Sequence, residues 1–230
     1  MSKIALIFGG SGGIGQAICA EFRKRKVTVY WTSYQRTKKN KNPYILHCDV
    51  TKNKEIKNVI SYVLKKERRI DIVINSVTPP LKLKTIENLS KQEFKEDIDT
   101  ILVGGINIAK AIIPIMKAKR SGIMVNILSI LVLGGASVRM SSYISAKYGL
   151  FGFTKCLALE LTPFNIFVFG VSPSFVKTNL IKVFPNKLFE IEKKKRKNEK
   201  LIHPVEVAKV VLDMTQNPQR YKTGENIEIN

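Results

Sequence analysis

The chain has 230 residues, 44% of them hydrophobic, and its 39 lysines and arginines against 18 acidic residues give a net charge of +21. A chain of this length and composition can bury one large core, so we expect a single domain over residues 1–230. The three cysteines are an odd number without metal-type pairing, which argues against a disulfide framework or a metal site. We expect them to pack as small apolar residues.

The chain shows no pattern of export or membrane insertion. Its first residues lack the charged, apolar and small-residue order of a secretory signal, and its longest nearly apolar run contains Asn126, Ser129 and two glycines. We therefore expect a cytoplasmic protein. The positive charge indicates an acidic partner or only a solvated, lysine-rich surface. Nucleic-acid binding is not predicted, because no known module and no aromatic residues interleaved with the basic clusters are present.

The chain opens with a candidate phosphate-binding loop. Residues 3–8 form an apolar run typical of a buried strand, five glycines follow within seven residues, and a helical pattern then continues to about Lys26. Glycines let a backbone approach a pyrophosphate, and a helix N-terminus supplies N–H donors. A turn without function is the alternative, at a conformational cost. The candidate residues are Gly9, Ser11, Gly12, Gly13, Ile14 and Gly15.

The end of the second predicted strand, residues 27–32, indicates which nicotinamide cofactor is used. An NAD site usually has an acidic residue here for the ribose hydroxyls, whereas cations hold the 2′-phosphate of NADP. No Asp or Glu occurs between Val27 and Cys48. The sequence therefore favours NADP(H), with Ser33 and Arg36 as candidate contacts, although the lysines that follow can also be ordinary loop charge.

The remaining elements alternate between strands and helices. Strands are predicted at residues 44–47, 70–75, 123–128, 166–171 and 224–229, and helices at 53–64, 91–119, 143–161 and 204–214. Strands that are apolar throughout indicate an α/β fold: a Rossmann-type, doubly wound parallel sheet with helices on both faces. Ligands then bind beyond the carboxyl ends of the strands, where the glycines, Asp49, Asn75 and Ser129 fall.

The second half of the chain has three further features: a predicted irregular helix, a predicted dimer surface and a charged insert. In the helix over 91–119, the pair Gly104-Gly105 predicts close packing and Pro114 a kink or local break. The apolar excess of this helix and of the helix over 143–161 predicts that each pairs with its copy across a dimer. A charged insert at about 180–202, helix-like from 186 to 200, is expected to lie over the site.

The chemistry of the site is predicted from Tyr143 and Lys147. On a helix these two side chains share a face, and a cation beside a phenol favours the phenolate and lowers its pKa. Ser129 lies at the end of the apolar run at 123–128, where its hydroxyl can hold a carbonyl oxygen while the tyrosine protonates it. Alone, this tyrosine and lysine would most often be an ordinary surface pair; the other motifs favour catalysis.

The motifs together resemble those of the short-chain dehydrogenases/reductases over nearly the whole chain. The residues that match in order and spacing are Gly9, Gly13, Gly15, Asp49, Asn75, Ser129, Tyr143, Lys147, Pro173 and Thr178. The resemblance implies hydride transfer between NAD(P)H and a carbonyl or alcohol, in a homodimer or homotetramer. Tyr143 would be the general acid/base, Lys147 would lower its pKa and hold the nicotinamide ribose, and Ser129 would orient the substrate oxygen. The cofactor would meet Thr178 near its nicotinamide and Asp49 and Val50 near its adenine. Asn75, Pro173 and Val176 would also bind it.

Several positions depart from the pattern of that family. Phe8 replaces the usual threonine before the glycines, the segment from Asn75 to Thr78 replaces Asn-Asn-Ala-Gly, and Ser174 replaces a glycine. Ile101 stands where the family has an asparagine that anchors a water molecule of the proton relay. A lapsed enzyme that only binds NADP(H), as a regulatory or scaffold protein, is therefore one alternative.

Within that family the chain is most similar to 3-oxoacyl-(acyl-carrier-protein) reductases, by its length and by the Val205–Ala208 and Thr223–Glu225 segments. We therefore predict NADPH-dependent reduction of a ketone, with a 3-oxoacyl thioester on an acidic acyl carrier protein as substrate. Candidate contacts with the carrier are Lys117, Lys119, Arg120 and residues 193–197. A reductase of free small ketones or sugars is the second enzymatic alternative.

Overall fold

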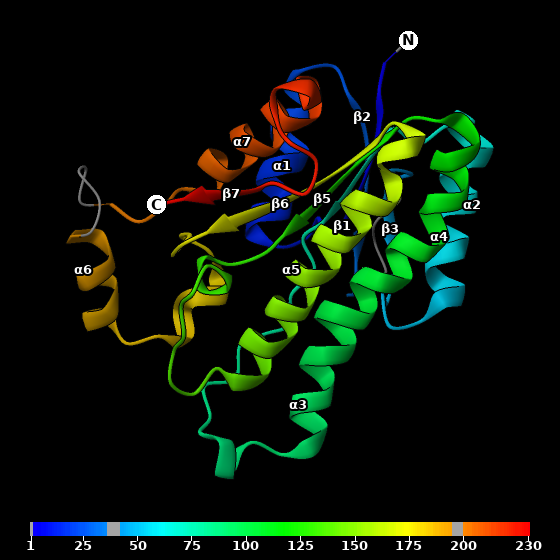
Figure 1. The fold of residues 1–230 in the computed structure, drawn as a ribbon. Coiled ribbons are helices and arrows are strands. Elements are labelled where there is room, and N and C mark those ends of the chain that lie inside the picture. The colour runs from blue at the N-terminus through cyan, green and yellow to red at the C-terminus, as the bar shows by residue number, and fades with distance from the viewer. Residues whose placement is uncertain (1, 36–41, 195–199) are drawn as a thin grey trace.

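One parallel sheet organises the protein (Figure 1). The computed structural model describes residues 2–35, 42–194 and 200–230. Within these residues the sheet has seven strands in the order β3-β2-β1-β4-β5-β6-β7, and every neighbouring pair is parallel. All carboxyl ends therefore meet at one edge. The strands are β1 (Ile4–Phe8), β2 (Thr28–Ser33), β3 (Ile45–His47), β4 (Ile72–Asn75), β5 (Gly122–Ile127), β6 (Ile166–Pro173) and β7 (Asn226–Ile229).

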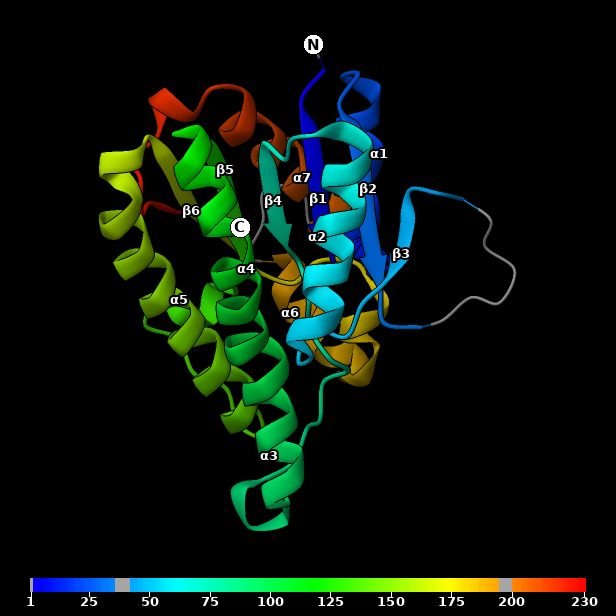
Figure 2. The same cartoon turned by 90° about the vertical axis from the view of Figure 1, so that its right-hand side faces the viewer.

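Helices cover both faces of the sheet (Figure 2). On one face α1 and α7 enclose a core with the sheet, and on the other α2, α4 and α5 do so. This arrangement confirms the doubly wound, Rossmann-type architecture that the apolar strands predict. The helices are α1 (Gly13–Lys24), α2 (Asn53–Glu67), α3 (Lys91–Asp97), α4 (Gly104–Lys119), α5 (Ser141–Leu161), α6 (Asn186–Lys194) and α7 (Pro204–Gln216).

The central strands are buried on both sides, as their composition predicts. Every residue of β1, β4 and β5 is buried. The register places Phe8 beside Asn75 and Asn75 beside Asn126, so these three residues form a row next to the carboxyl edge. Two polar residues in this row stand at the point where the active-site loops begin.

The stretch predicted as one helix over 91–119 differs from the prediction. It consists of α3, a π-helical segment at Ile98–Val103 and α4, and α4 continues without a break through Pro114. The irregularity therefore lies a dozen residues before the proline, at the turn that contains Ile101. By length and composition Lys91–Lys119 is apolar enough to cross a membrane, but Ile101, Ile108 and Ile112 are buried in the protein core. We interpret it as a core helix.

The close packing predicted at Gly104-Gly105 is confirmed. A Cβ atom on Gly104 would lie 2.6 Å from Val50 Cγ2, and one on Gly105 would lie 2.7 Å from Leu150 Cδ1. Both distances are far below van der Waals contact. The two glycines therefore let the start of α4 approach α5 and the loop after β3.

A network of charged side chains around a buried carboxylate lies at the amino edge of the sheet. Asp71 is 6% exposed, accepts a 2.9 Å hydrogen bond from the Ile4 N–H, and forms ion pairs with Arg69 and Lys119. Burial opposes ionisation of Asp71, but these bonds outweigh it and lower the pKa of the carboxyl. This network joins β1, β4 and the end of α4.

The cysteines are all free, and two of them pack as predicted. Cys19 and Cys48 are buried, whereas Cys156 is exposed. The prediction of apolar packing is therefore wrong for Cys156, because this residue lies on the outer face of α5.

Candidate active site

The glycine loop turns sharply between β1 and α1. Gly9 has a φ of +78°, and a Cβ atom there would lie 2.8 Å from the backbone of Ser76. A Cβ atom on Gly15 would lie 2.3 Å from the Gly9 carbonyl oxygen. At Gly12 the nearest atom to a Cβ would be 3.5 Å away, and no side chain caps the N-terminus of α1. The loop therefore keeps its helix N–H groups free of side-chain partners, which is what a pyrophosphate requires.

The segment after β6 reaches this loop. A Cβ atom on Gly13 would meet Thr178 Cγ2 at 2.5 Å, so Thr178 packs directly on the glycine loop. Pro173 ends β6, and the buried Val176 forms a parallel bridge with Ile202. The structure thus brings the predicted cofactor contacts of the glycine loop and those of the segment after β6 together at the carboxyl edge of the sheet.

The missing threonine at position 8 has a counterpart from the neighbouring strand. The Gly9 N–H donates to Thr32 Oγ1 at 3.3 Å, and Thr32 is 1% exposed. Trp31, the residue before it, packs against Gly10. The sequence analysis did not identify Thr32, although its place at the end of β2, beside β1, was a usable signal.

The predicted adenine side is only partly described. Ser33 ends β2 and is 9% exposed; Arg36 lies outside the described residues. The Asp49 carboxylate accepts hydrogen bonds from the Thr51 N–H at 3.0 Å and from the Thr51 hydroxyl at 2.7 Å. The Val50 side chain lies in the core against Gly104. Asp49 and Glu55 are thus acidic groups at this corner, and both oxygens of Asp49 already have partners in Thr51 and Lys52.

Asn75 belongs to a buried polar chain. Its Nδ2 donates to Asn126 Oδ1 at 3.2 Å, and Asn126 Nδ2 donates to Thr154 Oγ1 at 2.9 Å. The Val77 N–H donates to Asn75 Oδ1 at 3.2 Å. The Asn75 side chain therefore fixes the loop after β4 and ties β4 through β5 to α5.

Ser129, Tyr143 and Lys147 come together at the carboxyl edge. Ser129 follows β5; its hydroxyl accepts a 3.3 Å hydrogen bond from the Leu131 N–H and is near enough to Tyr143 to lower the pKa of the phenol. Tyr143 lies in the first turn of α5, and Lys147 lies one turn later. The Lys147 ammonium donates to the Ile127 carbonyl oxygen at 2.7 Å and sits 5.8 Å from the centre of the Tyr143 ring. The three side chains are 8%, 9% and 1% exposed.

The pKa values of this group differ from the sequence prediction. Burial raises the pKa of Tyr143, the Ser129 hydroxyl lowers it and the charge of Asp97 raises it, and together they bring it to about 12. Burial also lowers the pKa of Lys147 to about 7. The prediction of a lowered phenol pKa is therefore wrong for this structure, because desolvation of Tyr143 outweighs the effect of Ser129 and Lys147 is itself only partly cationic near pH 7.

Ile101 contributes only apolar surface to this region. It is fully buried in a cluster with Tyr143, Leu128 and Ala146. One turn before it, Asp97 is buried and accepts a 2.5 Å hydrogen bond from the Ser142 hydroxyl. The sequence analysis missed this pair. The available signal was that Asp97 shares the apolar face of its helix with Phe94 and Ile101.

Comparison with known proteins agrees with this geometry, since residues 3–187 match the short chain dehydrogenase family. The chain belongs to that family. The 3-oxoacyl-(acyl-carrier-protein) reductase of Thermotoga maritima is 28% identical over 239 residues, covering 99% of this chain and 96% of the relative. The enzyme of the same name from Buchnera aphidicola is 30% identical over 236 residues, with the same coverage of both chains. The solved structure of ElxO with NADP bound superposes with a TM-score of 0.89 at 26% identity, covering 100% of this chain and 97% of ElxO.

As a short-chain dehydrogenase, the protein is an oxidoreductase whose family uses NAD(P)(H). The residues present fit such a cofactor: the glycine loop leaves the α1 N-terminus uncapped, and Thr178 lies against it. The residues that would hold it are those of the loop, together with Ser33, Thr178 and Lys147.

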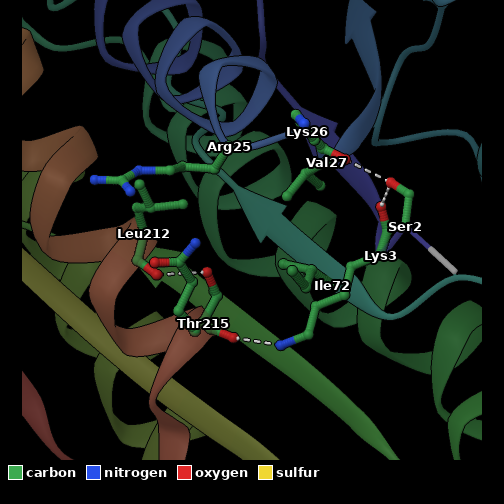
Figure 3. A pocket seen from close by; sticks show the side chains of 9 residues that line it. Ser2, Lys3, Arg25, Lys26, Val27, Ile72, Leu212 and Thr215 are labelled. Carbon is green, nitrogen blue, oxygen red and sulfur yellow. Dashed lines mark hydrogen bonds between the residues drawn. The ribbon is translucent and has the colours of Figure 1, made fainter.

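Other basic groups and a cavity lie far from this edge. Lys117 and Arg120 lie over the ring of Phe164 at the end of α4, at the amino edge of the sheet, and Lys119 binds Asp71 there. These three candidate contacts with a carrier therefore lie at the edge of the sheet opposite the site. A cavity of about 580 Å³ also lies at the amino edge (Figure 3). Its lining is Ser2, Lys3, Arg25, Lys26, Val27, Ile72, Leu212, Thr215 and Gln216.

Proposed function

We propose that this short-chain dehydrogenase reduces a ketone to a secondary alcohol with NADPH. The observation that carries the proposal is the buried Tyr143 phenol, with the Ser129 hydroxyl near it and Lys147 one turn away, at the same edge of the sheet as the glycine loop. Proton donation to a carbonyl oxygen requires such a group at the edge where parallel sheets bind ligands.

The roles of the three residues follow from their contacts. NADPH, when bound, supplies the hydride that the carbonyl carbon accepts. The Ser129 hydroxyl holds the substrate oxygen, and Tyr143 gives that oxygen its proton. A raised pKa keeps the phenol protonated at neutral pH, which suits a proton donor. The Ile127 carbonyl holds Lys147 in place, where its ammonium can bind the ribose hydroxyls of the cofactor.

NADP(H) is proposed over NAD(H) because of charge at the end of β2. No acidic residue occurs from Val27 to Cys48, and Ser33 ends the strand. Arg36 is proposed as the partner of the 2′-phosphate. ElxO, which was solved with NADP bound, supports this preference by similarity.

A 3-oxoacyl thioester on an acyl carrier protein is the proposed substrate. The similar reductases of Thermotoga maritima and Buchnera aphidicola support this class. Exposed lysines on the segment after β6 and on α6 face solvent at the carboxyl edge, where an acidic carrier would approach. They are Lys177, Lys182, Lys187 and Lys194. Of the predicted basic run at 193–197, residues 195–197 lie outside the described residues.

A second candidate function rests on Ile101. Its apolar side chain takes the place of the relay asparagine beside Tyr143, so a protein that binds NADP(H) without turnover is the alternative. Reduction of a free ketone or sugar is the other enzymatic candidate.

The deciding experiment is NADPH oxidation with acetoacetyl-CoA, acetoacetyl carrier protein and a free ketone, and with NADH in parallel. We expect turnover with NADPH, the fastest rate with the carrier at low salt, and loss of turnover in Tyr143→Phe with cofactor binding retained. Binding of NADPH without turnover of any ketone would establish the second candidate. Equal rates for the carrier and the free ketone would remove the carrier from the proposal.

We further propose that the protein is cytoplasmic and forms a homodimer or homotetramer through α4 and α5. Val103, Tyr148 and Leu159 are large apolar side chains exposed next to or on these helices. Light scattering after size exclusion would test this assembly, and a monomer at micromolar concentration would contradict it.

A further inference from the structure

A buried carboxylate lies behind the phenol. Asp97 is the last residue of α3, is 3% exposed, and accepts a 2.5 Å hydrogen bond from the hydroxyl of Ser142, which is 2% exposed. A carboxylate in such a place costs free energy unless its oxygens are bonded. A carboxylate on an otherwise apolar helix face therefore indicates a specific role for Asp97.

The N-terminus of α5 has no capping side chain and no acidic residue of its own, and Asp97 supplies a negative charge there. Met140 precedes the helix without a capping hydrogen bond, and the first turn contains no acidic residue. A negative charge near a helix N-terminus is favourable, and here it comes from a different helix. Because Ser142 directly precedes Tyr143, the bond from Asp97 also anchors the turn that carries the phenol.

The charge of Asp97 also acts on Tyr143 directly. It favours the protonated phenol, in the same direction as burial. The charged groups that face Asp97 are Lys82, Glu93 and Glu96. Lys82 pairs with Glu96, and Lys84 pairs with Glu93, so each acid has a compensating cation.

The groups that face Tyr143 are few. They are the Ser129 hydroxyl, the Asp97 carboxylate and, on its own helix, Lys147. Ile101 adds no polar group. Among the described residues, Asp97 is therefore the anion that influences the phenol.

We propose that Asp97 is a positioning residue of this site, which anchors the first turn of α5 through Ser142 and, through its buried charge, adds to the effect of burial in favouring the protonated Tyr143 phenol. The role in catalysis rests on the proposed function, in which Tyr143 is the proton donor. A phenol held in its protonated form favours reduction, since the reverse oxidation needs the phenolate as base. Asp97 thus moves to higher pH the range in which the phenolate is available for the reverse oxidation.

The test measures the phenol itself. Protein labelled with carbon-13 at the tyrosine Cζ is titrated by NMR, with the Tyr143 signal assigned by its absence in Tyr143→Phe. In Asp97→Asn, whose amide can still accept the Ser142 bond, we expect the Tyr143 pKa to fall by about one unit. The phenolate fraction in the alkaline range below the midpoint then rises about tenfold.

Controls separate charge from folding. Glu96→Gln makes the same charge change on a side chain that is 48% exposed, and it should leave the Tyr143 titration unchanged. Ser142→Ala keeps the charge and should not lower the Tyr143 pKa. If Asp97→Asn does not fold, Asp97→Thr serves instead, because its hydroxyl can accept the same bond without a charge. An unchanged Tyr143 titration in a folded Asp97 variant, or a shift matched by Glu96→Gln, overturns the inference.

Activity provides a separate readout. The alkaline limb of the kcat profile should move down with the Tyr143 pKa in Asp97→Asn, and the ratio of alcohol oxidation to ketone reduction at pH 9 should rise about tenfold, with the KM for NADPH unchanged. A shifted NMR titration without any ketone turnover would refute the proposed function and leave the electrostatic role of Asp97 intact. Ketone turnover with an unshifted Tyr143 titration would support the proposed function and refute the electrostatic role of Asp97.

Discussion

Burial of Lys147 lowers the free energy of unfolding by an amount that depends on pH. Its side chain is 1% exposed and donates a 2.7 Å hydrogen bond to the Ile127 carbonyl oxygen. Burial lowers its pKa to about 7, whereas the unfolded chain keeps an ordinary lysine pKa of about 10.4. Between these two values the unfolded state binds more protons than the folded state, so this group makes stability rise with pH across that window.

The magnitude follows from the size of the shift. At pH 7 the folded lysine is half protonated and the unfolded one fully so, which lowers the unfolding free energy by about 4 kcal/mol relative to pH above 10. Lys147→Met removes this term and fills the space with apolar atoms. We expect the variant to have a larger unfolding free energy than the wild type near pH 7. Between pH 7 and pH 9 the unfolding free energy of the wild type should rise by about 2 kcal/mol relative to that of the variant.

The assay is urea unfolding followed by circular dichroism at pH 7, 8 and 9. Other groups that titrate in this range, such as the thiols of Cys19 and Cys48, are present in both proteins and cancel in the difference. Lys155→Met, an exposed lysine on the same helix, is the matched control and should run parallel to the wild type. Parallel pH dependences for the wild type and Lys147→Met would refute the assignment of a lowered lysine pKa.

Three further outcomes are expected. Gly15→Ala should lower the unfolding free energy by more than about 2 kcal/mol, because its Cβ would lie 2.3 Å from the Gly9 carbonyl oxygen, whereas Gly12→Ala should be tolerated in a thermal melt. Ile101→Asn should cost about 1–3 kcal/mol in urea unfolding, since it puts an amide into an apolar cluster, and Ile101→Leu should cost less. Asp71→Asn should destabilise the protein at pH 7, and because the carboxyl pKa is lowered in the folded state, the deficit against wild type should shrink as the pH falls below about 4. A deficit that persists unchanged at low pH would contradict this account of Asp71.

The order of elements followed from the sequence because it depends on local composition. Apolar runs that are buried on both faces predict parallel strands, and the glycines between the first run and its helix predict the phosphate loop. The proximity of Ser129 to Tyr143 and Lys147 could also be expected, since Ser129 follows the carboxyl end of a predicted strand and the other two residues share one face of the next helix. The π-helical turn at Ile98–Val103 was not predictable in the same way, because hydrogen-bond register is set by packing on α5 and α4.

Long-range contacts and desolvation were decided only by the tertiary structure. The sequence has Lys147 beside Tyr143 and so predicts a lowered phenol pKa, but burial of both groups reverses that direction. Spacing along the chain places Asp97 on a helix face and does not reveal that this face meets Ser142 of α5. The chain alone therefore determined the fold class and the edge of the sheet at which the predicted site residues lie. Their protonation states and partners depend on how much water the folded protein removes from around them.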